Sequence, residues 1–128
     1  MRIMIVDDSA AFREATRHLL SKNPICEIVA EAENGIVAIE KHETTKPDII
    51  LMDVEMPILN GIEATKQILQ IDNHVKIIAV TAYQEGIYLE GLGNIGFTNY
   101  VNKNKVFDQL EDAILNAYAY SENKKTFN

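Results

Sequence analysis

Several short apolar runs of the sequence are followed, at once or within two residues, by a polar or charged side chain. These side chains belong to Asp7, Asp8, Asp53, Thr81 and Lys103. If the runs are parallel strands of one sheet, the residues that follow them share its carboxyl edge, where open α/β sheets bind their ligands. We therefore expect three carboxylates, a hydroxyl and an ammonium group at one edge. Taken singly, each residue also suits a helix cap, a turn or an ordinary surface position, so the prediction depends on the set.

The chemistry of this set favours a metal-assisted reaction with an anion. Three carboxylates at one edge would repel one another unless a cation lies between them. Oxygen ligands suit Mg²⁺, which typically takes one or two carboxylates and keeps several waters, and Mn²⁺ could substitute. One divalent cation and Lys103 bring the charge of the site to about zero, so that a phosphoryl group can enter. Asp53 would then act as the nucleophile, and Thr81 could donate a hydrogen bond.

The elements that must position these residues alternate along the chain. Apolar runs predict strands, and segments of helical period lie between them. The predicted strands are Ile3–Val6, Ile28–Glu31, Ile49–Met52, Ile77–Val80 and Tyr100–Val101. The apolar helical faces are Phe12, Ala15, Leu19 and Leu20, then Ile36, Val37 and Ile39, then Ile62, Thr65, Ile68 and Leu69, and last Phe107, Leu110, Ile114 and Ala117. Unbroken apolar runs are typical of strands buried on both faces of a parallel sheet.

This alternation predicts an α/β fold with a doubly wound, five-stranded parallel sheet and five helices. The strand order 2-1-3-4-5 is taken from flavodoxin-like sheets. Ser9, Asn60 and Asn104 are predicted to cap the first, third and last helices. Glycine weakens a helix, so we expect the fourth helix to be short or irregular. It would contain or adjoin Gly86, Gly91 and Gly93.

Composition limits the classes of function. The 128 residues carry a net charge of -7, and residues 1–64 hold 12 of the 19 acidic residues, so direct binding to nucleic acid or anionic lipid is not expected. No signal peptide or membrane span is apparent, and the single Cys26 fits a reducing compartment, so we expect a cytoplasmic protein.

Residues 1–120 are predicted to form one domain and residues 121–128 a polar tail or the start of a linker. The three histidines lack ligand spacing and predict no transition-metal site.

Four segments of the sequence resemble the receiver domain of two-component response regulators. They are Ile5-Val6-Asp7-Asp8-Ser9, then Leu51-Met52-Asp53-Val54-Glu55-Met56-Pro57 with Asn60-Gly61, then Thr81-Ala82, and Tyr100-Val101-Asn102-Lys103 after Gly96. Their order and spacing match the family over residues 1 to about 119. The resemblance implies that Asp53 is phosphorylated, with Mg²⁺ held by Asp8, Asp53 and the backbone carbonyl of Glu55, and with Asp7 acting largely through water.

The same resemblance implies a switch and a set of partners. Thr81 and Tyr100 would form the switch pair, which reshapes the face of the fourth helix, fifth strand and fifth helix. Tyr83 would flank the site and slow hydrolysis. The phosphoryl donor would be a histidine kinase or a histidine phosphotransfer protein. The output would be a downstream protein, an output domain absent from this chain, or a homodimer formed through the switch face.

One departure from the family concerns the residue after Lys103. The family usually has proline there, in a cis bond, whereas this chain has Asn104. We expect a cis bond between Lys103 and Asn104 if the lysine is to reach the phosphoryl site, although such a bond costs about 2.5 to 4 kcal/mol before a residue other than proline.

Two alternatives to a phosphorylated receiver stay open at this point. The first is an aspartyl-phosphate hydrolase of the haloacid dehalogenase type, which resembles D-x-D after its first strand, whereas this chain has the pair Asp7-Asp8 there. The second is a receiver-like module that signals by binding alone, although such a module has no need for three repelling carboxylates. A receiver would accept phosphate on itself and lose it slowly by autodephosphorylation, and it would not be a multiple-turnover enzyme.

Overall fold

Five parallel strands form one sheet in the order β2-β1-β3-β4-β5, which confirms the predicted order. The strands are β1 (Arg2–Val6), β2 (Glu27–Ala32), β3 (Ile49–Asp53), β4 (Lys76–Thr81) and β5 (Asn99–Asn102). The structure is a computed structural model that describes the backbone of residues 1–82 and 86–127 and the side chains of residues 1–82 and 90–119. Each predicted strand is present and is one or two residues longer than the predicted run, because backbone pairing continues past the apolar side chains.

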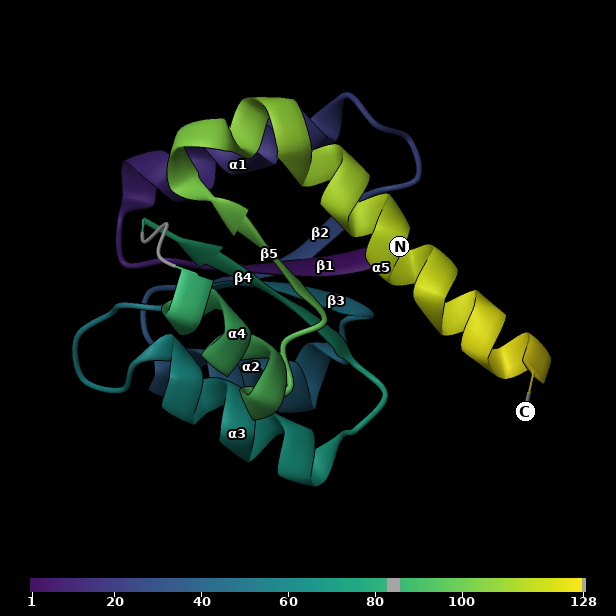
Figure 1. The fold of residues 1–128 in the computed structure, drawn as a ribbon. Helices are drawn as coiled ribbons and strands as arrows, with labels where there is room; N and C mark the ends of the chain where they lie inside the picture. Colours follow the sequence, from purple (N-terminus) through teal and green to yellow (C-terminus); the bar gives the residue numbers. More distant parts are fainter. Residues whose placement is uncertain (83–85, 128) are drawn as a thin grey trace.

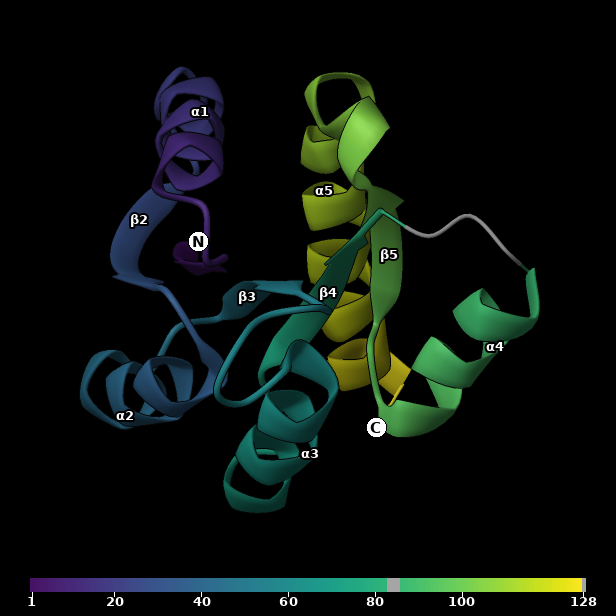
Figure 2. The same ribbon diagram turned by 90° about the vertical axis from the view of Figure 1, so that its left-hand side faces the viewer.

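Helices cover both faces of this sheet (Figures 1 and 2). They are α1 (Ala10–Ser21), α2 (Gly35–Thr45), α3 (Gly61–Ile71), α4 (Gly86–Ile95) and α5 (Val106–Phe127), with a 3₁₀ turn, η1 (Lys103–Lys105), before α5. Residues of α1 and α5 pack on one face, and residues of α2, α3 and α4 pack on the other. Helix α5 continues through residues 121–127, the segment expected as a polar tail or linker. In the part of the chain that the structure describes, no helix is both long and apolar enough to span a membrane.

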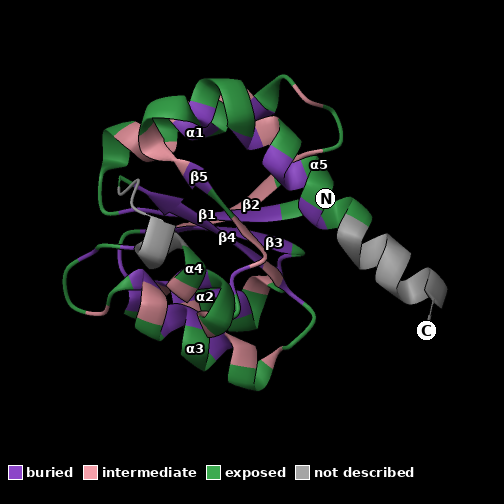
Figure 3. Cartoon of the chain, in the orientation of Figure 1, coloured by how far each residue is buried: buried purple, intermediate pink, exposed green. Residues whose placement is uncertain are grey.

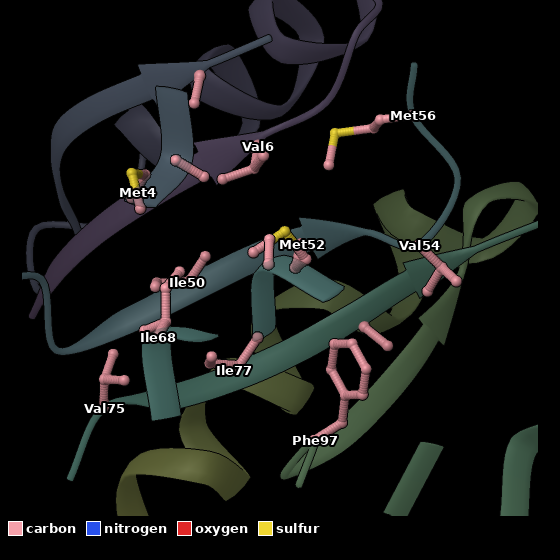
Figure 4. Close-up of a cluster of buried hydrophobic side chains, with 14 of the residues drawn as sticks. Met4, Val6, Ile50, Met52, Val54, Met56, Ile68, Val75, Ile77 and Phe97 are labelled. Atoms are coloured by element: carbon pink, nitrogen blue, oxygen red, sulfur yellow. The ribbon is translucent and has the colours of Figure 1, made fainter. Parts of the chain in front are cut away.

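Alternate residues of the strands supply the two cores. Met4, Ile50 and Met52 point into the cluster under α2, α3 and α4, whose members Figure 4 shows as sticks. Their neighbours Ile3 and Leu51 point into the cluster under α1 and α5. The central strands are therefore buried on both faces (Figure 3). This is the burial that unbroken apolar runs predict, and it holds the carboxyl ends of the strands in place.

Two of the three predicted helix caps are confirmed. The side chain of Ser9 accepts a hydrogen bond from the backbone of Phe12, and that of Asn60 does the same at the start of α3. The prediction for Asn104 is wrong, because η1 precedes α5 and the residue that caps this turn is Asn102. Asn34 caps α2, which the sequence reading missed.

Two residues predicted on buried helical faces are exposed. Phe107 is 68% exposed, because α5 turns the neighbouring Val106 and then Leu110 toward the sheet. Ile36 is exposed because the buried face of α2 begins one residue earlier, at Gly35, and continues through Ala38. In both cases only the first residue of the predicted face is wrong, because the later members, such as Leu110 and Ile114 of α5, are buried as predicted.

Helix α4, at ten residues, is the shortest of the α-helices that the structure describes, as expected, but it is continuous and its glycines do not interrupt it. Gly86 is its first residue, and Gly91 and Gly93 lie inside it. A Cβ atom added at either internal position would meet no atom within 4 Å. Close packing therefore does not explain why these two positions are glycine.

The peptide bond between Lys103 and Asn104 is trans, so the expectation of a cis bond is corrected. The local reason is the turn η1, in which the N–H of Asn104 donates to the side chain of Asn102 at 2.9 Å. A proline at this position would lack that N–H. The lysine side chain nevertheless reaches the carboxyl edge of the sheet.

Candidate functional site

Three carboxylates gather where β1 and β3 end. Asp7, Asp8 and Asp53 each offer an oxygen, and these oxygens lie within 4.8 Å of one another. The sheet creates this proximity, because Val6 pairs with Met52, which places the next residues, Asp7 and Asp53, side by side at the strand ends. Asp7 and Asp53 are buried, whereas Asp8 is exposed to solvent.

Lys103 reaches this cluster from the start of η1. Its ammonium nitrogen lies 2.8 Å from Oδ2 of Asp7 and 3.3 Å from Oδ2 of Asp53. Burial opposes the charged form, but the hydrogen bond to Asp7 and the negative charges of Asp53 and Asp7 outweigh it and raise the pKa of Lys103. The lysine is therefore a fixed positive charge at the site.

Asp53 lies in an environment that disfavours its own charge. Burial and the neighbouring charge of Asp7 raise the pKa of Asp53 to about 6, although Lys103 and the backbone N–H of Glu55 act in the opposite direction. Two buried carboxylates share one ammonium group, so a negative charge is left uncompensated. A divalent cation would supply the missing positive charge, and the donor set of carboxylate oxygens suits Mg²⁺.

The β1–α1 connection is held by hydrogen bonds to Asp7. Its Oδ1 accepts from the backbone N–H of Ser9 at 2.8 Å, and its backbone carbonyl accepts from Nη1 of Arg13 at 2.6 Å. Arg13 in turn pairs with Glu31 of β2 at 3.3 Å. The sequence reading missed Arg13, whose signal is its position one turn after the acidic pair on the predicted first helix.

The β3–α3 connection explains why glycine follows Asn60. The N–H of Gly61 donates to the carbonyl of Val54 at 2.9 Å, and a Cβ atom at Gly61 would lie 2.0 Å from the carbonyl oxygen of Asp53. Helix α3 can begin this close to Asp53 because a hydrogen occupies that position. The backbone N–H of Glu55 donates to Oδ1 of Asp53 at 3.3 Å, which ties the start of this connection to the Asp53 side chain.

A strained turn follows at Ile58. The N–H of Leu59 donates to the carbonyl of Pro57 at 2.9 Å, and Ile58 between them has a φ of 72°. This is the hydrogen bond of a γ-turn with a positive central φ, a rare conformation that a β-branched residue disfavours strongly. The Ile58 side chain is 81% exposed, so burial does not compensate for the strain.

Thr81 and Tyr100 occupy the two strands beyond Asp53. Thr81 is buried at the end of β4, directly beside β3, and in the β4–β5 register it pairs with Asn102. Tyr100 is about half exposed on the edge strand β5. Tyr83, expected to flank the site, lies outside the described residues.

Phe12 is a second residue that the sequence reading missed. It was placed only on the apolar face of the first helix, yet the Lys103 ammonium lies 4.7 Å from the centroid of its ring. Nothing in the helical period distinguishes a ring that contacts a lysine from one that only packs in the core. His42 is a buried residue that the sequence did not single out: it is 1% exposed, and its Nε2 lies 2.9 Å from Oδ2 of Asp72.

Comparisons with known proteins agree with this geometry. Residues 3–115 match the family model of the response regulator receiver domain. The chemotaxis protein CheY of Bacillus subtilis is 40% identical over 114 residues, which cover 88% of this chain and 93% of CheY. The transcriptional regulatory protein DegU of Brevibacillus brevis is 35% identical over 114 residues, which cover 89% of this chain. This chain spans only about half the length of DegU, 48%.

A solved structure supports the same assignment. A two-component response regulator of the LuxR family from Aurantimonas sp. SI85-9A1 superposes with a TM-score of 0.88 at 36% identity, over 92% of this chain and 84% of that one. The predicted flavodoxin-like fold and the predicted family are thus confirmed, and the hydrolase alternative finds no support. The chain belongs to the family of response regulator receiver domains.

Proposed function

We propose that Asp53 accepts a phosphoryl group from a phosphorylated histidine of a kinase or of a phosphotransfer protein. The observation that carries the proposal is the placement of Asp53 beside Lys103 and within 4.8 Å of two further carboxylates. The Asp53 carboxylate would attack phosphorus, and the bond from phosphorus to the donor nitrogen would break. Lys103 neutralises one oxygen of the transferred group, and Thr81, at the next strand end, donates a hydrogen bond to another.

The same edge is proposed to hold Mg²⁺, with Mn²⁺ as a substitute. Asp8, Asp53 and the backbone carbonyl of Glu55 would be its protein ligands, and Asp7 would contact it largely through water. The exposure of Asp8 supports this arrangement, since a hydrated cation can reach it from solvent. When bound, the ion supplies positive charge to the phosphoryl oxygens.

The proposed output is a change in the face formed by α4, β5 and α5. Thr81 would move toward the phosphoryl group, and Tyr100 would turn into the space it leaves. Tyr100 and Phe107 expose apolar surface on β5 and at the start of α5, which a downstream protein, an output domain or a second copy of this chain could cover. We further propose that residues 1–120 act as the receiver unit and that the protein works in the cytoplasm.

Mass spectrometry after incubation with acetyl phosphate tests the proposal. With Mg²⁺, the protein should gain one phosphoryl group, and it should gain none with excess chelator or in Asp53→Asn. The adduct should last, whereas a hydrolase would release phosphate over many turnovers, and a binding module would show no adduct. An adduct that persists in Asp53→Asn would contradict the assignment of Asp53.

A further inference from the structure

The ammonium group of Lys103 has an aromatic neighbour in addition to its two carboxylates. Its nitrogen lies 4.7 Å from the centroid of the Phe12 ring, inside the range of about 6 Å over which a ring face attracts a cation. The carboxylates belong to Asp7 on the β1–α1 connection and to Asp53 on β3. The ring belongs to α1, so three separate elements meet at one ammonium group.

The Phe12 ring is held in place by the start of α1 and by the core. The backbone N–H of Phe12 donates to the side chain of Ser9, the cap of α1, at 3.2 Å, and the N–H of Ser9 donates to Asp7. The Phe12 side chain packs against the core cluster under α1 and α5. A cavity of only about 10 Å³ lies beside it, lined among others by Thr16 and Leu110. The ring therefore has little space to move away from Lys103.

The ring and the carboxylates differ in whether a divalent cation competes with Lys103 for them. A divalent cation at this edge would share the charge of Asp7 and Asp53 and would repel the ammonium group. The face of a phenyl ring is not a ligand for a hard, oxygen-seeking cation, so its attraction for Lys103 would remain. A flexible four-carbon stem gains from such a second support, because ordering its rotamers costs free energy.

We propose that Phe12 is a positioning residue, whose ring holds the Lys103 ammonium at the phosphoacceptor edge through a cation–π contact. This inference rests on the proposed phosphorylation of Asp53 for its functional consequence, although the contact itself does not. Removing the ring should slow phosphorylation by acetyl phosphate by about 2- to 30-fold, the range that corresponds to measured cation–π energies. Binding of Mg²⁺ should change much less, because the face of a phenyl ring is not a ligand for this ion.

The decisive experiment keeps the shape of the ring and changes its charge distribution. Phenylalanine with one, two or three ring fluorines at position 12 retains nearly the same volume but has a less negative face, whereas Phe12→Leu removes the face. Phosphorylation of Asp53 is followed at saturating Mg²⁺ and acetyl phosphate, so that the rate and not the apparent affinity is compared. The logarithm of the rate should fall stepwise with each added fluorine.

A second measurement uses the metal-free protein and no phosphoryl donor. In NMR spectra, the ring current should shift the ε-methylene protons of Lys103 away from those of the exposed Lys66, and the shift should disappear in Phe12→Leu. If wild type shows the shift but no phosphorylation, the proposed function fails while the contact stands. If fluorination leaves the rate unchanged, or if Lys103 shows no ring-current shift, the positioning role is overturned, even where Phe12→Leu is slow or unfolded.

Discussion

The ammonium nitrogen of Lys103 lies closer to Asp7, at 2.8 Å, than to Asp53, at 3.3 Å. Without a metal ion the lysine is therefore held chiefly by the residue that is not proposed to be phosphorylated. Asp7 is buried and anchored by Ser9, so it forms a rigid counter-charge. Lys103 can keep this partner while the charge on Asp53 changes during phosphorylation.

Asp7→Asn is expected to weaken Mg²⁺ binding by about 10- to 100-fold, the usual effect of losing a group that supports a metal through its shell of water. Isothermal titration calorimetry with Mg²⁺ measures this directly. Asp112→Asn, an exposed change on α5, removes the same charge far from the site and serves as the control. Equal affinity in the two variants would contradict the role given to Asp7.

The raised pKa of Asp53 predicts a pH dependence of stability in chelator. The pKa of Asp53 is about 6 in the folded protein and 3.8 ordinarily. The proton on Asp53 therefore stabilises the folded state fully below pH 3.8, and this stabilisation is lost as the pH rises through about 6. Urea denaturation should thus show wild type losing stability relative to Asp53→Asn between about pH 4 and 6. Adding Mg²⁺ at pH 7 should stabilise wild type more than the variant. If the difference in free energy of unfolding between wild type and Asp53→Asn does not change with pH, the raised pKa of Asp53 is refuted.

The pair His42–Asp72 should give a pH dependence of stability in the opposite direction. Burial opposes ionisation, but the hydrogen bonds from His42 and from the backbone of His74 lower the pKa of Asp72. A lowered pKa gives stability that is present above the ordinary value and is lost as the pH falls. Asp72→Asn should therefore unfold about 1 kcal/mol more easily at pH 7, with the difference shrinking toward pH 3. Thermal unfolding across this range, with Asp112→Asn as control, checks the trend.

Alanine should stabilise the protein at the two internal glycines of α4. Since a Cβ at Gly91 or Gly93 meets nothing within 4 Å, each substitution should add about 1 kcal/mol to the free energy of unfolding. Gly61→Ala is the matched opposite, because its Cβ would collide with the Asp53 carbonyl, and it should destabilise. Urea denaturation of the three variants measures whether each one gains or loses stability. A loss of stability at Gly91 and Gly93 would show that α4 needs these glycines.

Ile58 stores backbone strain that glycine would release. Ile58→Gly should raise the free energy of unfolding by about 1 kcal/mol, the strain of a positive φ less the added freedom of the unfolded chain. Ile58→Asn tests the same point without added freedom, because asparagine tolerates a positive φ. If both variants are less stable than wild type, the exposed isoleucine has a packing role that its 81% exposure does not suggest.

The sequence predicted the sheet and the site for one physical reason. Strands buried on both faces are apolar throughout, so their ends were visible, and the residue after each end, such as Asp53, falls at the carboxyl edge. The features that the sequence did not predict depend on where a helix begins or on contacts between residues far apart in the chain. Phe107 was misplaced because the turn η1 places the start of α5 at Val106, and Val106 takes the buried position at the beginning of the helix. The contact between Phe12 and Lys103 joins residues from opposite ends of the chain, and no local pattern encodes it.

The place of β1 between β2 and β3 also decides which part of the chain supplies the acidic edge. Both strands that pair with β1 lie before residue 54, so Asp7, Asp8 and Asp53 all come from the first half of the chain. The ammonium group beside Asp7 and Asp53 comes from Lys103, in the second half. The carboxylates of the site and their ammonium partner therefore belong to two halves of the sheet, which the pairing of β3 with β4 joins.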